Sequence, residues 1–320
     1  MRTTLPDGTL PDGQARTGLG IWPTPLQTAD GPAGIYVKRD DLCGFAFGGS
    51  KVRALEPLLG EALGRQAQII VTGGRRDSNW VALAAIAAAR LGLRCHCVLD
   101  PGPSRPLAVT LAERFGARLH AAKEPGGQAV NAAIAGLAGE LGASAYAIPR
   151  AGAAPAGVAG YRAMARELLD QLPVTQADVV VALGSGGMCA GLLLGLAEAS
   201  RSGAGPDVRV VGVPVAKTAA EATAAVRRLL GQVRRQQLSQ TEPDAALARL
   251  RVCVRRASPG GSRSELADRV EARCGTLLDP VFAGPAWHAF CAQRPDPGRA
   301  AVLVASGGLP AYLDATQRDR

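Results

Sequence analysis

Lys51 is the residue whose placement in this sequence most clearly indicates covalent chemistry. It follows Gly48-Gly49-Ser50 and begins an apolar stretch that we expect to be helical, although the whole chain has only four lysines. A lysine that is desolvated at such a position has a lowered pKa and can form a Schiff base with a carbonyl compound. The alternative is a surface lysine, but the N-terminus of a helix disfavours a cation. We therefore predict that Lys51 is a nucleophilic amine.

A glycine-rich loop, Gly184-Ser185-Gly186-Gly187-Met188, separates a buried apolar run from a helical one. Successive glycines let backbone N–H groups close around an anion, and a helix N-terminus adds a positive partial charge. The loop matches no nucleotide motif, because Cys189 stands where a dinucleotide fingerprint has glycine and the lysine of a P-loop is missing. The sequence therefore predicts a phosphate-bearing ligand, with an ordinary tight turn as the alternative.

Two further polar positions follow predicted strands. Ser78 and Asn79 begin a helix after Gly73-Gly74, where hydroxyl, amide and backbone N–H groups can receive a carboxylate. Simple capping of that helix by Asp77 or Ser78 explains the same pattern equally well. Ser306 follows the last buried run, at the edge of the sheet where ligands bind in α/β folds.

The elements that must position these residues alternate between short buried strands and helices rich in alanine and leucine. The pattern predicts strands at 67–72, 179–183 and 301–305, which end in the loops above, and helices at 51–63, 78–91 and 188–200. Such alternation is typical of an α/β fold in which helices cover a largely parallel sheet.

The composition excludes several other classes of protein. With 47% hydrophobic and 20% charged residues among 320, the chain is neither disordered nor fibrous. Its net charge of +9 comes mainly from arginine, but only 4% of the residues are aromatic and able to stack on bases. We therefore expect no nucleic-acid partner. We also expect no membrane span, because the apolar run at 179–197 is interrupted by the loop at 184–187.

The cysteines and the N-terminus bear on the location of the protein. The seven cysteines are scattered and form no CxxC pair, and Cys95-His96-Cys97 is too tight for the usual zinc spacing. We expect reduced thiols and no metal. Residues 1–20 lack the apolar stretch of a signal peptide. These features together predict a cytoplasmic protein.

The motifs, taken in this order, resemble the pyridoxal-phosphate (PLP) enzymes of fold type II, in the branch of 1-aminocyclopropane-1-carboxylate (ACC) deaminase and D-cysteine desulfhydrase. The resemblance extends from Thr24-Pro25-Leu26 to Ser306-Gly307-Gly308. It implies an α/β fold of two open, twisted, mostly parallel sheets with helices on both faces, as in the β subunit of tryptophan synthase. It also implies a large PLP-binding domain of residues 1–52 and 160–320, a smaller inserted α/β domain of residues 53–159, an active site in the cleft between them, and a homodimer.

The same resemblance implies a role for each motif. Lys51 would form the Schiff base with PLP and remove the Cα proton of the substrate, and Ser78 would be a second catalytic residue. The substrate would contact Ser78, Asn79, Trp80 and Phe282. The cofactor would be held by Lys51, Asn79, Gly184, Ser185, Gly186, Gly187, Met188 and Ser306.

This sequence departs from the family pattern at Ser50 (asparagine in the family), Trp80 (histidine or glutamine), Met188 (threonine), Phe282 (tyrosine) and Ala283 (threonine or glutamate). The departures leave cofactor binding largely to backbone groups and remove acid–base groups near the substrate. Ser306 would be a neutral partner of the pyridine nitrogen, which suits elimination. We therefore expect a PLP-dependent lyase or deaminase that acts on a small α-amino acid through Cα-proton abstraction. A β-replacement synthase of specialised metabolism and a degenerate PLP-binding protein without turnover remain as alternatives.

Overall fold

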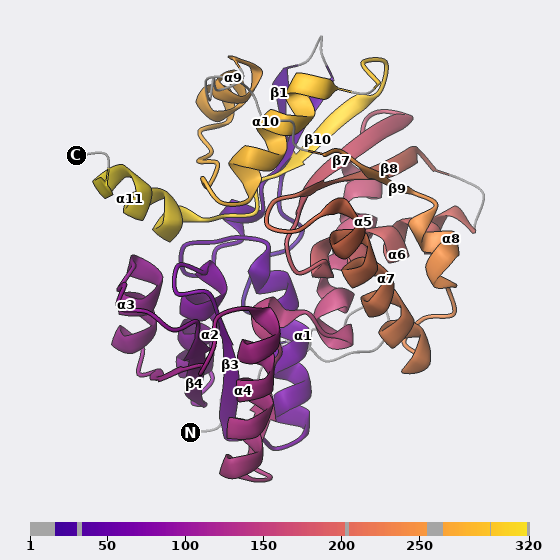
Figure 1. Ribbon diagram of the computed structural model, residues 1–320. Coiled ribbons are helices and arrows are strands. Elements are labelled where there is room, and N and C mark those ends of the chain that lie inside the picture. The colour runs from indigo at the N-terminus through magenta and orange to yellow at the C-terminus, as the bar shows by residue number, and fades with distance from the viewer. Residues whose placement is uncertain (1–16, 31–33, 202–204, 255–264, 295, 319–320) are drawn as a thin grey trace. The chain divides into compact units, whose positions relative to one another are not determined.

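The computed structural model describes residues 17–30, 34–201, 205–254, 265–294 and 296–318, which form two compact units (Figure 1). Unit 1 consists of Met1–Gly20, Lys51–Gly157 and Leu309–Arg320, and unit 2 of Ile21–Ser50 and Val158–Gly308. Residues 1–16 lie outside the described ranges. They include the start of the predicted large domain and most of the N-terminal segment from which a cytoplasmic location was predicted. The predicted domain boundaries and the predicted active site between the domains stay predictions.

Unit 1 is built on a four-stranded parallel sheet. The strand order is β5 (Arg118–Ala121), β4 (Arg94–Leu99), β3 (Ile69–Gly74) and β6 (Ala145–Ala147). Helix α4 (Gly127–Leu141) covers one face, and α2 (Asn79–Arg90) packs on the other, beside α1 (Lys51–Gly64) and α3 (Leu107–Arg114). Every residue of β3 is buried, because helices lie on both faces of a parallel sheet. Helix α11 (Leu309–Arg318) packs against α3.

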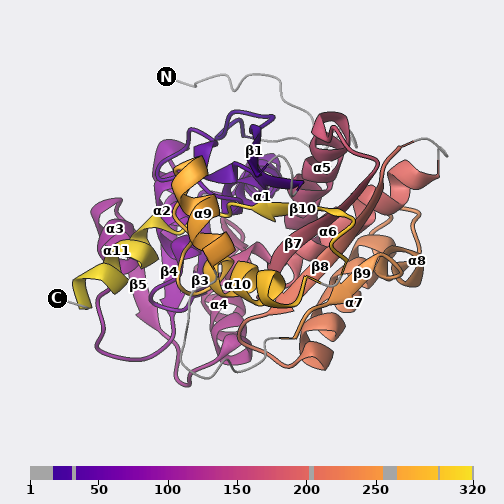
Figure 2. The same cartoon turned by 90° about the horizontal axis from the view of Figure 1, so that it is seen from above.

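Unit 2 contains a six-stranded sheet in which every neighbouring pair is parallel except β1 with β2. The strand order is β1 (Leu26–Asp30), β2 (Ile35–Lys38), β10 (Ala300–Val304), β7 (Gln176–Leu183), β8 (Asp207–Pro214) and β9 (Leu250–Val252). Helices α9 (Glu265–Cys274) and α10 (Ala283–Gln293) lie over one face (Figure 2). Helices α5 (Pro155–Gln171), α6 (Gly187–Ser200) and α7 (Ala219–Arg235) lie over the other, and α8 (Pro243–Leu247) contacts α6 and α7.

The predicted α/β class with two mostly parallel sheets is confirmed. The strands predicted before the three loops are β3, β7 and β10, and the helices predicted at 51–63, 78–91 and 188–200 are α1, α2 and α6. No helix in the described ranges is long and apolar enough to cross a membrane. All seven cysteines lie in those ranges as free thiols, and six of them are buried.

Candidate active site

Two glycine turns of unit 2 lie directly against each other. The N–H of Ser50 donates to the carbonyl oxygen of Ser306 over 3.1 Å. A Cβ atom on Gly307 would lie 2.7 Å from the Cα of Gly49, so a side chain has no room there. Gly49 and Gly307 also have φ values of +117° and +80°, in the region that favours glycine. The residue that precedes Lys51 in the chain is therefore held on the loop that carries Ser306.

Asp279 connects the Ser306 loop to the start of α10. Its side chain is fully buried, and its two oxygens accept hydrogen bonds from the N–H groups of Val281, Phe282 and Ala283 at 3.0, 2.7 and 2.9 Å. On the other side, a Cβ on Gly308 would lie 2.3 Å from the Cβ of Asp279. Asp279 was not among the predicted site residues. The available signal was an aspartate followed by proline at the start of a helix, which is typical of a cap.

Phe282 lies beside the glycine-rich loop. Its ring is half-buried, and a Cβ on Gly184 would lie 3.3 Å from its Cε1 atom. Phe282 was predicted to contact the substrate, and that role stays a prediction. The structure brings together four of the predicted motifs in unit 2, because the contacts run from Ser50 through Ser306 and Asp279 to Phe282 and Gly184.

The glycine-rich loop joins the end of β7 to the start of α6. Gly186 precedes the helix with φ of +90°, and a Cβ on it would lie 3.3 Å from the backbone nitrogen of Val226. No side chain in the described part of the protein caps α6. The first N–H groups of a helix need partners outside it, so this uncapped turn offers donors for an anion. The binding of a phosphate at this turn stays a prediction.

Lys51, Ser78 and Asn79 lie in unit 1, at the first turns of α1 and α2. Lys51 is the half-buried first residue of α1. Ser78 has the extended backbone of an N-cap residue, but its hydroxyl makes no capping hydrogen bond. The Oδ1 atom of Asn79 is buried and has no hydrogen-bond partner among the described residues. A buried acceptor that lacks a partner is unfavourable unless a ligand satisfies it, so the Asn79 side chain fits a ligand site.

Trp80 lies in the core of unit 1. It is fully buried, and its Nε1–H donates to the Oγ1 atom of Thr72, also fully buried, over 2.9 Å. Gly152, which has φ of +67°, leaves the space for the indole ring, because a Cβ there would lie 2.5 Å from Cη2 of Trp80. The structure thus gives Trp80 a packing environment. Its predicted contact with the substrate stays a prediction.

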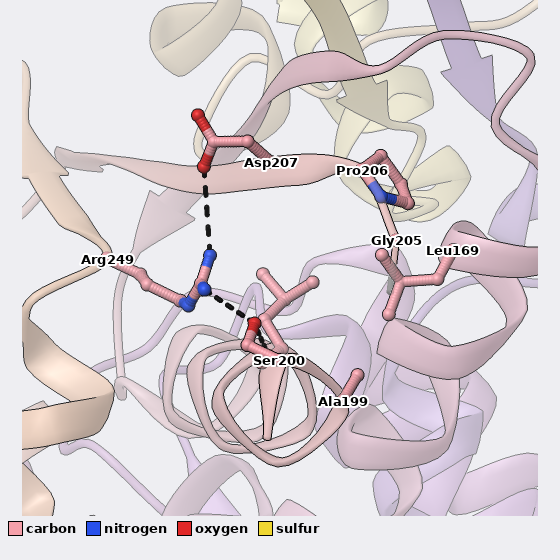
Figure 3. A pocket seen from close by; sticks show the side chains of 8 residues that line it. Leu169, Ala199, Ser200, Gly205, Pro206, Asp207 and Arg249 are labelled. Carbon is pink, nitrogen blue, oxygen red and sulfur yellow. Dashed lines mark hydrogen bonds and ion pairs between the residues drawn. The ribbon is translucent and has the colours of Figure 1, made fainter. Parts of the chain in front are cut away.

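A separate hollow of about 210 Å³ lies on unit 2, at the start of β8 (Figure 3). It is lined by Leu169, Leu196, Ala199, Ser200, Gly205, Pro206, Asp207 and Arg249. The guanidinium of Arg249 donates to the hydroxyl of Ser200 and pairs with the carboxylate of Asp207. None of the predicted site residues lines this hollow, so it is not the candidate active site.

The fold is of the α/β class, with an uncapped glycine-rich turn before α6. A family model described as "Pyridoxal-phosphate dependent enzyme" matches residues 17–304. The chain belongs to this family, and its cofactor is pyridoxal 5'-phosphate.

Individual relatives agree with this assignment. The chain is 30% identical over 315 residues to a protein of Pyrococcus horikoshii that carries the provisional name 1-aminocyclopropane-1-carboxylate deaminase, with 92% of each chain covered. It is 30% identical over 314 residues to D-cysteine desulfhydrase of Salmonella paratyphi A, covering 91% of this chain and 93% of the relative. A crystal structure titled as an ACC deaminase homologue superimposes with a TM-score of 0.79 at 28% identity, covering 95% of this chain and 96% of the other. The predicted family, fold type and cofactor are confirmed.

Proposed function

We propose that this enzyme is a lyase or deaminase that removes the Cα proton of a small α-amino acid. The observation that carries the proposal is the packing of the Gly49 and Gly307 turns, which holds the residue before Lys51 on the loop that carries Ser306. Lys51 follows this packed turn directly in the chain. Relatives named as a deaminase and a desulfhydrase, at 30% identity over most of the chain, support the same reaction class.

The proposed roles follow from the side chains and backbone groups present. Bound PLP supplies an electron sink that acidifies the Cα–H bond of an amino acid joined to it. The Nζ atom of Lys51 would hold the cofactor and would serve as the base for the Cα proton. The N–H groups of Ser185–Met188 bind the phosphate at the N-terminus of α6, with no hydrogen bond from the Met188 side chain. Asn79 would contact both the cofactor and the substrate. The hydroxyl of Ser78 would bind the substrate and carry the second, substrate-side proton transfer.

Ser306 and Phe282 narrow the choice of reaction. The hydroxyl of Ser306 would be a neutral partner for the pyridine nitrogen of PLP, which would suit elimination. The names of the relatives suggest ACC and D-cysteine as candidate substrates. Phe282 has no phenol with which to move a proton, so we propose that Ser78 carries the substrate-side proton transfer alone. We also propose a cytoplasmic homodimer. This rests on the family resemblance and on the seven cysteines of the sequence, and light scattering of the purified protein tests the dimer.

The first experiment identifies the lysine. Protein purified with PLP should absorb visible light, and reduction with borohydride followed by peptide mapping should label Lys51. Lys38 is the internal comparison, because it is fully buried and its Nζ lies 2.9 Å from Oε2 of Glu167. A label on Lys38, Lys123 or Lys217 in place of Lys51 would contradict the proposed site.

The second experiment identifies the reaction. A panel of small D- and L-amino acids is screened for a change in the visible spectrum, then for release of ammonia and a keto acid. A lyase or deaminase releases both products from one substrate. A synthase consumes a second substrate, and a degenerate protein does neither. Only the first result supports the proposal.

A further inference from the structure

Asp279 is a buried carboxylate at a junction of unit 2 that the proposed chemistry does not use. Its side chain is 0% exposed, and both of its oxygens accept backbone N–H groups from the segment that begins α10. Hydrogen bonds to an ionised acceptor are roughly twice as strong as neutral ones. The Asp279 side chain therefore helps to set the direction of the backbone from Val281 to Ala283.

One side of Asp279 touches the loop that follows β10. A Cβ on Gly308 would lie 2.3 Å from the Cβ of Asp279 and 3.0 Å from its Cγ. Gly308 follows Ser306 by two residues, and the carbonyl of Ser306 accepts the N–H of Ser50. A shift of the aspartate would press directly on the loop that carries Ser306.

The Oδ1 atom of Asp279 accepts a hydrogen bond from the backbone of Phe282. The N–H of Phe282 makes the shortest of the three hydrogen bonds, at 2.7 Å. The Phe282 ring in turn lies against Gly184, the first residue of the glycine-rich loop. The backbone bond from Asp279 therefore sets where the ring meets this loop.

We propose that Asp279 is a positioning residue that orients the Ser306 loop and the glycine-rich loop together. The inference rests on the proposed function, in which these two loops hold the ring nitrogen and the phosphate of PLP. Asp279 acts through the backbone of 281–283 on one loop and through contact with Gly308 on the other. A change at Asp279 should therefore alter the environment of both ends of the cofactor.

The test is Asp279→Asn, measured in protein loaded with PLP. An asparagine keeps one acceptor oxygen but places an NH2 group against one of the three N–H donors. We expect PLP to bind about 10- to 100-fold more weakly, since hydrogen bonds to charged groups have that net strength. We also expect shifts of the visible absorption band and of the phosphorus NMR resonance of bound PLP. A purely structural aspartate would lower the unfolding temperature without moving either spectrum.

The matched control is Asp314→Asn in unit 1. Asp314 also accepts a backbone N–H with both carboxylate oxygens, from Leu107 at 3.1 and 3.0 Å. It should leave PLP affinity and both spectra unchanged. If Asp279→Asn does not fold, Gly308→Ala is the second variant, because its new methyl group would press on Asp279 with the carboxylate intact. Gly92→Ala, at a positive φ with nothing within 4 Å, controls for backbone strain.

The outcomes separate this inference from the proposed function. Wild-type protein that binds no PLP would refute the proposed site itself. Wild-type protein that binds PLP, together with an Asp279→Asn or Gly308→Ala variant of unchanged affinity and spectra, would overturn only the positioning role. A change of both spectra in either variant, with the controls unaltered, supports it.

Discussion

Replacing Trp80 with phenylalanine tests whether this side chain belongs to the core of unit 1 or to the substrate site. The change removes the hydrogen bond from Nε1 to Thr72, which joins the first turn of α2 to the end of β3. It also opens space beside Gly152, where the indole ring now leaves no room for a Cβ. Both effects act on the free energy of unfolding, because Trp80 is fully buried.

The magnitude follows from these two losses. The hydrogen bond contributes about 0.5–1.5 kcal/mol net. A smaller aromatic ring in a core that relaxes incompletely costs about 1–2 kcal/mol more. We therefore expect Trp80→Phe to lower the free energy of unfolding by about 1.5–3.5 kcal/mol. Thr72→Val should cost about 1–3 kcal/mol, because it leaves the buried Nε1–H of Trp80 without its acceptor.

Trp287→Phe is the control, and urea unfolding of the PLP-loaded protein is the assay. Trp287 is equally buried, but its Nε1 atom has no hydrogen-bond partner in the described part of the chain. Its replacement should therefore cost less than that of Trp80, because it creates a cavity but removes a buried N–H that has no acceptor, with an unchanged slope in urea. The packing role of Trp80 would be refuted if Trp80→Phe left stability unchanged and raised the KM for the substrate tenfold, because that pattern belongs to a residue that contacts substrate.

The remaining predictions concern packing, pH and catalysis. Gly191→Ala should destabilise the protein by about 1–3 kcal/mol, because its Cβ would lie 2.4 Å from that of Tyr161, whereas Gly139→Ala, with nothing within 4 Å, should stabilise it by about 0.5–1 kcal/mol. This prediction would be contradicted if denaturant unfolding showed that both glycine variants change the free energy of unfolding in the same direction. Burial, and then a neighbouring histidine, lower the pKa of His96. Below pH 6.5 the unfolded chain therefore binds more protons than the folded protein does. The contribution of His96 to the free energy of unfolding should be fully present above that pH and decrease below it. His96→Leu should then remove part of the decrease in unfolding midpoint between pH 8 and pH 5. Wild-type turnover of ACC and D-cysteine should be slow, and Phe282→Tyr should raise one of them, since acid–base groups contribute about 10²–10⁴-fold. Release of ammonia and keto acid by the two proteins measures this difference. Fast turnover by the wild type would show that a tyrosine hydroxyl at position 282 is not needed.

The parts of the fold that sequence could predict are those with local signals. Runs such as Ile69-Ile70-Val71 are buried on both faces of a parallel sheet, so their hydrophobicity is continuous and bounded by glycine. The glycine-rich loop and the Gly307 turn could be located because glycine is required where a side chain has no room.

Side-chain environments could not be predicted in the same way. The substrate contact of Trp80 is implied by the family resemblance and stays a prediction, whereas its packing environment had no signal in the sequence. Consecutive helical residues do not share a face, so Asn79 and Trp80 lie in different surroundings. The space for the indole ring is created by Gly152, which is distant in the sequence. The link from Asp279 to Gly308 likewise depends on packing that a single sequence does not reveal.

The two packed glycine turns have a consequence for how proteins of this kind can change. Packing between main-chain atoms does not depend on the identity of neighbouring side chains. Under the proposed roles, Ser50, Met188 and Phe282 could each be exchanged while Gly49 and Gly307 continue to hold the loops in register. Proteins with this fold can therefore change the side chains around the reaction one at a time while they still bind the cofactor. Libraries that seek new reactions should vary positions 50, 188 and 282 and leave the glycines untouched.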